Sequence, residues 1–217
     1  MARHGALARG MVGFMDRRRF IGAAAAAAGT LAAPARVFAQ PSGLDGRSAA
    51  ILEIARREVA RAGDVLWRRD VAGVADFSAH SALPRFHFAN LESGTVTSFR
   101  VAHGTGSDPE HDGFLKWFSN VPGSNATSRG AYVTWEWYTG RYGTSVRLGG
   151  LDPDNSNALE RLIVMHAAEY ARPEHVDRWG RLGRSNGCFA FAPDDFLTVL
   201  AQLSGGRLLF ADRLNLT

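Results

Sequence analysis

Residues 131–148, AYVTWEWYTGRYGTSVRL, are the stretch that most clearly indicates the fold. Aromatic and β-branched residues lie on both sides of Gly140, which is typical of two strands joined by a turn. The stretch therefore predicts a β-hairpin with strands at 131–138 and 144–148.

A second predicted hairpin lies N-terminal of the first. Its strands cover 85–91 and 95–101, and residues 92–94 (Glu-Ser-Gly) form the turn between them. Residues 103–130, between the two hairpins, are rich in Gly, Ser, Asn, Asp and Pro. Such a segment is longer than a simple connection between two strands needs, so we expect a functional surface loop.

The C-terminal third of the chain adds two predicted strands. Residues 162–165 form a short apolar run that reads as a buried strand with His166 at its end. A loop through 167–187 follows, and residues 207–210 form the last predicted strand.

Helical patterns are fewer. Ser48 can cap an amphipathic helix that Gly63 ends, residues 157–161 suggest a short helix, and 194–203 suggest another. No internal repeat interrupts the pattern. We therefore expect a mainly β domain with minor α+β character and two or three flanking helices.

Length and charge limit the classes of function. The 217 residues are 46% hydrophobic and 10% aromatic, enough for a real core, and the formal net charge is +4. Residues 1–39 hold six Arg and one Asp, so the remaining chain has 19 basic and 20 acidic residues, a net charge of −1. The basic excess thus belongs to the N-terminal segment, and a nucleic acid partner is not expected.

Residues 1–39 have the pattern of an export signal. Arg17-Arg18-Arg19-Phe20-Ile21 precedes an Ala-rich apolar run, and Ala39 ends a small-residue cleavage site. The paired arginines are typical of twin-arginine export. The apolar run is too short to span a bilayer, although a retained anchor is the alternative. Met11 or Met15 is an alternative start. We expect the protein in the periplasm or elsewhere in the cell envelope, with membrane contact only during export.

Cys188 is the single cysteine of the chain and has no partner for an intrachain disulfide. It ends the stretch Gly183-Arg184-Ser185-Asn186-Gly187-Cys188, in which glycines allow positive φ and exposed N–H groups. In an exported protein such a cysteine is buried and inert, bridged to another chain, or reactive. The turn favours a nucleophile, with the N–H groups of Gly187 and Cys188 as oxyanion donors.

His166 is the candidate base, because a rigid strand holds it while the 167–187 loop returns Cys188 toward it. Arg184 can add positive potential that favours the thiolate. The alternative is that Cys188 is a small core residue, His166 a hydrogen-bonded strand end and Arg184 a surface charge. The other histidines are scattered without ligand spacing, so no metal or cofactor is expected.

Five stretches in order resemble the exported murein L,D-transpeptidases, the YkuD-like catalytic domains, in the branch with a Gly-Arg-Ser-x-Gly-Cys motif. The resemblance implies a β-sandwich-like catalytic fold, acylation of Cys188 by a peptidoglycan stem peptide, and His166 as its partner. It divides the chain into a linker and N-terminal helix at 40–76 and a catalytic domain at 77–217. The stretches are 101–104, 118–124, 147–151, 163–170 and 183–188.

Two positions depart from that family. Asn186 stands where the branch commonly has Trp, and Phe189 stands where Pro is expected. Both bear on substrate fit more than on chemistry. His103 matches an upstream His-Gly of the branch and is a candidate for lining the site.

Three further residues are weaker candidates for substrate binding or support. Ser185 is expected to orient either His166 or its own turn. Tyr132 and Arg147 either support the site or only pack and pair.

The resemblance implies an L,D-transpeptidase of cell wall biogenesis, a transferase that acts on peptidoglycan stem peptides. With water as acceptor, the same residues make an L,D-carboxypeptidase. A non-catalytic peptidoglycan-binding module of the same fold is the alternative from another class. The sequence does not identify the acyl acceptor or the oligomeric state.

Overall fold

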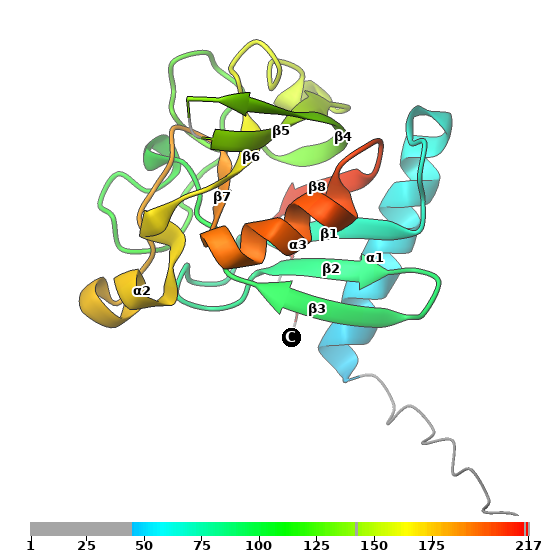
Figure 1. Ribbon diagram of the computed structural model, residues 1–217, viewed down its shortest axis with the longest axis horizontal. Helices are drawn as coiled ribbons and strands as arrows, with labels where there is room; N and C mark the ends of the chain where they lie inside the picture. The colour runs from blue at the N-terminus through cyan, green and yellow to red at the C-terminus, as the bar shows by residue number, and fades with distance from the viewer. Residues whose placement is uncertain (1–44, 142, 215, 217) are drawn as a thin grey trace, which may run out of the picture. The chain divides into compact units, whose positions relative to one another are not determined.

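The computed structural model describes residues 45–141, 143–214 and 216, so the predicted export signal and the first five residues of the predicted linker and helix at 40–76 lie outside the described residues. Eight strands form one sheet in the order β3-β2-β1-β8-β4-β5-β6-β7 (Figure 1). The strands are β1 (Val71–Asp76), β2 (Phe86–Asn90), β3 (Thr95–Phe99), β4 (Gly130–Gly140), β5 (Gly143–Gly150), β6 (Val164–Ala167), β7 (Phe189–Phe191) and β8 (Leu208–Asp212).

Three α-helices accompany the sheet: α1 (Gly46–Ala62), α2 (Pro173–Trp179) and α3 (Pro193–Leu203). None of the helices in the described residues is both long enough and apolar enough to cross a bilayer. The short 3₁₀ helices are η1 (Gly63–Val65), η2 (Thr105–Ser107), η3 (Pro153–Asn155) and η4 (Glu169–Ala171).

The sheet is mixed. β1 runs parallel to β8 and β6 parallel to β7, whereas the other neighbouring strands are antiparallel. A register shift between Thr134 and Trp137 marks a bulge in the β4–β5 pair, and bulges increase local twist. The expected mainly β, sandwich-like domain with two or three helices is confirmed as one sheet curled into a half-barrel.

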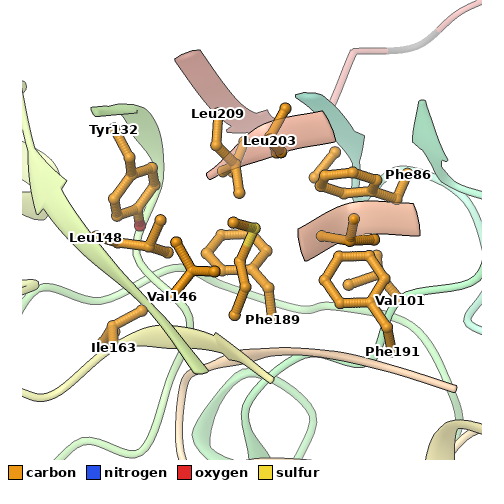
Figure 2. Close-up of a cluster of buried hydrophobic side chains, with 14 of the residues drawn as sticks. Phe86, Val101, Tyr132, Val146, Leu148, Ile163, Phe189, Phe191, Leu203 and Leu209 are labelled. Carbon is orange, nitrogen blue, oxygen red and sulfur yellow. The ribbon is translucent and has the colours of Figure 1, made fainter. Parts of the chain in front are cut away.

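Two apolar layers cover the sheet. Helix α3 contributes Phe196, Val199 and Leu203 to one cluster. In this cluster the Phe86 and Phe191 rings pack edge to face, with 4.8 Å between their centroids (Figure 2). Helix α1 contributes Ile51, Leu52, Ala55 and Val59 to the second cluster. Strand β1 serves both layers, since Val71 and Ala75 belong to the first cluster and Ala72 and Val74 to the second, as the two-residue period of a strand requires.

Strand β7 lies at one end of the sheet, yet all three of its residues are buried. Its outer edge is paired with residue 102: the Ala102 N–H donates to the Ala190 carbonyl at 2.8 Å, and the Ala190 N–H donates back at 3.4 Å. A separate bridge, parallel instead of antiparallel, joins Gly104 to Ser185 in the turn before the strand. Ala102 therefore closes the edge of β7 at its central residue, Ala190.

The two predicted hairpins are confirmed as β2–β3 and β4–β5. Strands β1 and β7 and helix α2 were not predicted. Because β1 lies inside the sheet, the compact unit extends N-terminal of residue 77. The helix predicted at 157–161 is wrong: those residues form hydrogen-bonded turns that end at Leu162, whose φ is +54°.

His87 on β2 makes the stability of the domain sensitive to acid. Its side chain is 1% exposed; Nδ1 lies 2.8 Å from Ser98 Oγ, whereas Nε2 has no hydrogen-bond partner among the described residues. Burial lowers the pKa of His87 to about 4. The unfolded chain therefore binds a proton from about pH 6.5 downward while the folded chain does not, and stability falls as the pH drops.

We expect His87→Gln to remove this pH dependence, because glutamine can keep a hydrogen bond to Ser98 but does not titrate. The loss of unfolding free energy between pH 7 and pH 5 should be smaller in the variant by about 2 kcal/mol. Urea denaturation at both pH values measures it. An unchanged difference between the two pH values would assign the acid sensitivity to other groups.

Candidate active site

Cys188 and His166 lie on neighbouring parallel strands. His166 is the third residue of β6 and pairs with Ala190 of β7, and Cys188 is the residue immediately before β7. Both side chains are largely buried, with 8% of Cys188 and 3% of His166 exposed. Both line one cavity of about 130 Å³, as predicted from the strand and the returning loop; its lining residues are His166, Tyr170, Arg184, Ser185, Asn186 and Cys188.

The backbone just before His166 surrounds the sulfur of Cys188. The thiol donates to the Leu162 carbonyl, with 3.6 Å between Sγ and O, and the Val164 N–H hydrogen bonds to the sulfur. Burial raises the pKa of the Cys188 thiol, while the Val164 N–H and the positive charge of Arg161 act in the opposite direction. The expectation of a depressed cysteine pKa is therefore wrong: desolvation outweighs the positive neighbours, and the resting group is a thiol.

The environment of His166 favours the neutral imidazole over the charged imidazolium. Its Nδ1 lies 2.8 Å from the Ala167 carbonyl, which can only accept a hydrogen bond, so Nδ1 carries the proton of the neutral ring. Burial lowers the pKa of His166, and the bond to Ala167 opposes this. The ring is therefore neutral at pH 7, with Nε2 as its basic atom.

Ser185 stabilises the turn before Cys188 with two hydrogen bonds. The Ser185 hydroxyl donates to the Cys188 carbonyl at 2.7 Å and accepts the Gly187 N–H at 3.2 Å. Ser185 thus orients its own turn. The Gly187 N–H, expected to be an oxyanion donor, is already engaged by this hydroxyl.

Gly187 is required at its position for two reasons. Its φ is +113°, which side chains rarely allow, and a Cβ there would lie 2.8 Å from the Ala126 carbonyl. The glycine lets the 119–128 segment approach the turn directly.

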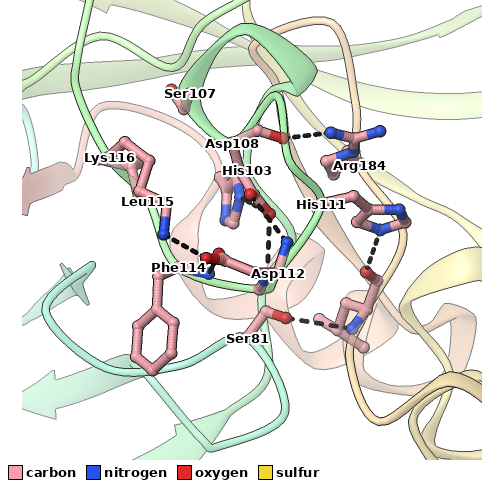
Figure 3. Close-up of polar contacts among 12 residues, drawn as sticks. Ser81, His103, Ser107, Asp108, His111, Asp112, Phe114, Leu115, Lys116 and Arg184 are labelled. Atoms are coloured by element: carbon pink, nitrogen blue, oxygen red, sulfur yellow. Dashed lines mark hydrogen bonds and ion pairs between the residues drawn. The ribbon is translucent and has the colours of Figure 1, made fainter.

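Arg184 and Asn186 lie on the wall of the cavity. Asn186 is exposed, while Arg184 donates from Nη1 to the carbonyls of Asp108 and Pro109. The Arg184 side chain therefore also anchors the 103–130 segment beside the cysteine turn (Figure 3).

His103 lies behind the cysteine turn and is not among the residues that line the cavity. It is 1% exposed; Nδ1 accepts from Arg85 Nη2 at 2.5 Å, and Nε2 lies 3.3 Å from Asp108 Oδ2. Burial and the Arg85 charge lower its pKa to about 2. The His103 carbonyl accepts the Ser185 N–H at 2.9 Å. His103 therefore supports the turn from the interior of the protein.

Tyr132 and Arg147 do not line the cavity. Tyr132 is fully buried in the core and donates to the Ser128 carbonyl at 2.7 Å. Arg147 pairs with Glu136 at 2.9 Å and lies 4.3 Å from the centre of the Tyr138 ring. Of the alternatives left open for these two residues, the structure favours packing and pairing.

Three residues at the site were not predicted. Tyr170 lines the cavity, the Leu162 carbonyl contacts the thiol, and Arg161 contributes charge near the sulfur. Leu162 has a left-handed backbone conformation, and its side chain is 67% exposed. No side-chain pattern in the sequence marks a residue that acts through its carbonyl. In the described residues, no three His, Cys, Asp or Glu side chains are grouped as metal ligands.

Several solved structures resemble the chain, each at low identity. An L,D-transpeptidase from Mycobacterium smegmatis is 18% identical, with a TM-score of 0.40 over 66% of this chain and 58% of that one. L,D-transpeptidase 3 from Mycobacterium tuberculosis, solved with a faropenem-derived adduct, is 15% identical, with a TM-score of 0.43 over 66% of this chain and 60% of that one.

The helical cell shape determining protein Pgp2 from Campylobacter jejuni is 11% identical, with a TM-score of 0.41 over 73% of this chain and 55% of that one. The chain thus spans less than two thirds of each of these proteins. No curated protein matches it.

The sequence pattern of a known family matches most of the described chain. The L,D-transpeptidase catalytic domain matches residues 49–211, from helix α1 to the last strand, and so includes both His166 and Cys188. The match covers well over half of the 217 residues. The chain therefore belongs to the family of the L,D-transpeptidase catalytic domain.

Proposed function

We propose that this protein is an exported L,D-transpeptidase that cuts and rejoins peptidoglycan stem peptides through a thioester at Cys188. One observation carries the proposal: a buried thiol and a neutral imidazole line the same small cavity. A cysteine nucleophile with a histidine base is one arrangement that carries out acyl transfer.

The chemistry begins with a protonated thiol. His166 Nε2 takes the thiol proton as Sγ attacks the carbonyl carbon between an L-centre and a D-centre of the stem peptide. The tetrahedral intermediate collapses, its C–N bond breaks, and the imidazolium gives its proton to the leaving amine of the terminal D-residue. The acyl group is then a thioester on Cys188.

An acceptor amine completes the reaction. It attacks the thioester while His166 takes a proton from the amine nitrogen, the C–S bond breaks, and the departing sulfur regains a proton from His166. The Cys188 N–H is the proposed oxyanion donor. Arg184, Asn186 and Tyr170 are the proposed contacts of the stem peptide, since they line the cavity.

Water as acceptor would give an L,D-carboxypeptidase, and loss of reactivity would leave a peptidoglycan-binding module. The mature chain 40–217 should be incubated with a carbapenem, whose strained lactam acylates active-site nucleophiles, and its intact mass measured. We expect one adduct that maps to Cys188. An intact mass equal to that of the free protein would support the binding module instead.

A disaccharide tetrapeptide, with and without a second stem peptide, separates the two activities. Cross-linked dimer supports the transpeptidase, and release of the terminal D-residue without dimer supports the carboxypeptidase.

The proposed substrate lies outside the cytoplasm, so the proposal includes export through residues 1–39. Arg17 and Arg18 are the paired arginines of the leader. Changing both to lysine keeps the charge, and we expect the precursor to stay in the cytoplasm, because twin-arginine export reads the arginine pair. Cell fractionation and immunoblotting measure it. If the double variant is exported normally, the twin-arginine route is wrong.

A further inference from the structure

Arg161 fastens both ends of the 119–128 segment. It lies in the turns before β6, and its guanidinium is half-buried. Nη1 donates to the Ser119 carbonyl at 2.7 Å and to Ser128 Oγ at 2.6 Å. Nη2 donates to Ser124 Oγ at 3.1 Å and to the Ala126 carbonyl at 2.6 Å. A planar guanidinium can make these four contacts at once, whereas an ammonium group cannot.

The segment that Arg161 fastens lies directly against the nucleophile turn. The Ala126 carbonyl, held by Nη2, is 2.8 Å from the position that a Cβ would occupy at Gly187. The neighbouring Asn125 carbonyl approaches Gly104 in the same way. The segment therefore packs against the glycine that precedes Cys188.

The residue after Arg161 contacts the sulfur. Leu162 has a φ of +54°, and its carbonyl accepts from the Cys188 thiol at 3.6 Å. This backbone conformation is costly for a leucine, and a 67% exposed side chain gains little from burial in return. The contacts of Arg161 and the Ile163 N–H bond to the Ala158 carbonyl at 2.9 Å hold the turn in place.

We propose that Arg161 is a positioning residue for Cys188, which holds the Leu162 carbonyl and the Gly187 turn around the thiol and places a positive charge near the sulfur. The proposal rests on the proposed function. The charge of Arg161 also lowers the pKa of Cys188 against the larger effect of burial. Arg161 does not itself line the cavity, and the titratable groups that share the cavity with the thiol are His166, Tyr170 and Arg184.

Two variants separate the charge of Arg161 from its hydrogen bonds. Arg161→Gln removes the charge, while Arg161→Lys keeps the charge but not the four contacts. Arg213→Gln is the matched control, because Arg213 also donates to loop carbonyls, those of Leu115 and Lys116, and is not among the residues that line the cavity. Thermal unfolding of each variant shows whether it folds.

The first measurement is the pH midpoint of Cys188 alkylation by iodoacetamide, which needs no substrate. We expect Arg161→Gln to raise the midpoint by roughly half a unit to one unit, and Arg161→Lys to stay near wild type. The second measurement is the rate of acylation by a carbapenem, which should fall about 10 to 100-fold in both variants, because small misplacements of a nucleophile are costly.

Wild-type midpoints and rates in both Arg161 variants would overturn the inference. Equal effects in Arg213→Gln would also overturn it, since the losses would then follow from loop stability alone. If Arg161→Gln does not fold, the acylation rate of Arg161→Lys decides. Failure of the wild-type protein to react with a carbapenem would count against the proposed function, while the alkylation midpoints would still test Arg161.

Discussion

Replacing Cys188 by serine should lower turnover of a stem tetrapeptide by on the order of 10⁴ to 10⁶-fold, the loss typical of removing a nucleophile. The serine hydroxyl is far less acidic than the thiol, and burial, which already raises the pKa of Cys188, disfavours an alkoxide even more. The carbapenem mass adduct should disappear with the activity.

The fold of Cys188→Ser should be unchanged. A hydroxyl is slightly smaller than a thiol and can donate to the Leu162 carbonyl, which accepts from the thiol in the wild type. Thermal unfolding of the two proteins should therefore agree closely. Wild-type turnover in a folded serine variant would rule out Cys188 as the nucleophile.

Replacing His166 by alanine should slow acylation by about 10²- to 10⁴-fold, the usual contribution of a general acid–base group. Because burial lowers the pKa of His166, the base stays neutral at lower pH than a free imidazole does. The wild-type rate should thus be constant near neutral pH and fall only below about pH 6.5. Carbapenem acylation followed across the pH range measures this fall, and the alanine variant should lack it.

His103→Ala is the control for that experiment. His103 lies between the buried Arg85 and Asp108, so its removal should destabilise the protein, by about 1–3 kcal/mol for unsatisfied buried groups. The acylation rate of His103→Ala should still fall at acidic pH, as in the wild type. If the acylation rate of His103→Ala no longer falls at acidic pH, while that of His166→Ala falls as in the wild type, the two histidines were assigned the wrong way round.

The hairpins were predictable from the sequence because their side chains are concentrated in β-branched and aromatic types. Strand β1, with the sequence VAGVAD, has Ala, Gly and Asp at four of its six positions, which carry little strand preference, and the three residues of β7 are too few to form a pattern. Both strands exist because neighbouring strands and the two apolar layers bury them. Tertiary contacts decide such segments, as is common for β structure.

The meeting of Cys188 and His166 at one cavity was predictable because a glycine-rich turn and an apolar strand are local signals. The protonation states were not, since the direction of a pKa shift depends on how much water the fold removes from each group. Arg161 and Leu162 were missed for a related reason. The roles proposed for them depend on the turn at 157–162, which the sequence suggested to be helical. They also depend on the Leu162 backbone carbonyl, which side-chain patterns do not reveal.

The closed edge of β7 limits how a peptide can reach Cys188. Many peptide-binding domains recruit an extended ligand as an extra strand on an open sheet edge. Here the Ala190 backbone already exchanges hydrogen bonds with Ala102. The N–H and carbonyl of Ala190 on β7 are therefore not available to pair with an added strand. For the proposed function, a stem peptide would therefore be recognised by groups around the cavity and not as an added strand on β7. This mode suits the proposed substrate, because a D-centre beside an L-centre would not fit a regular strand.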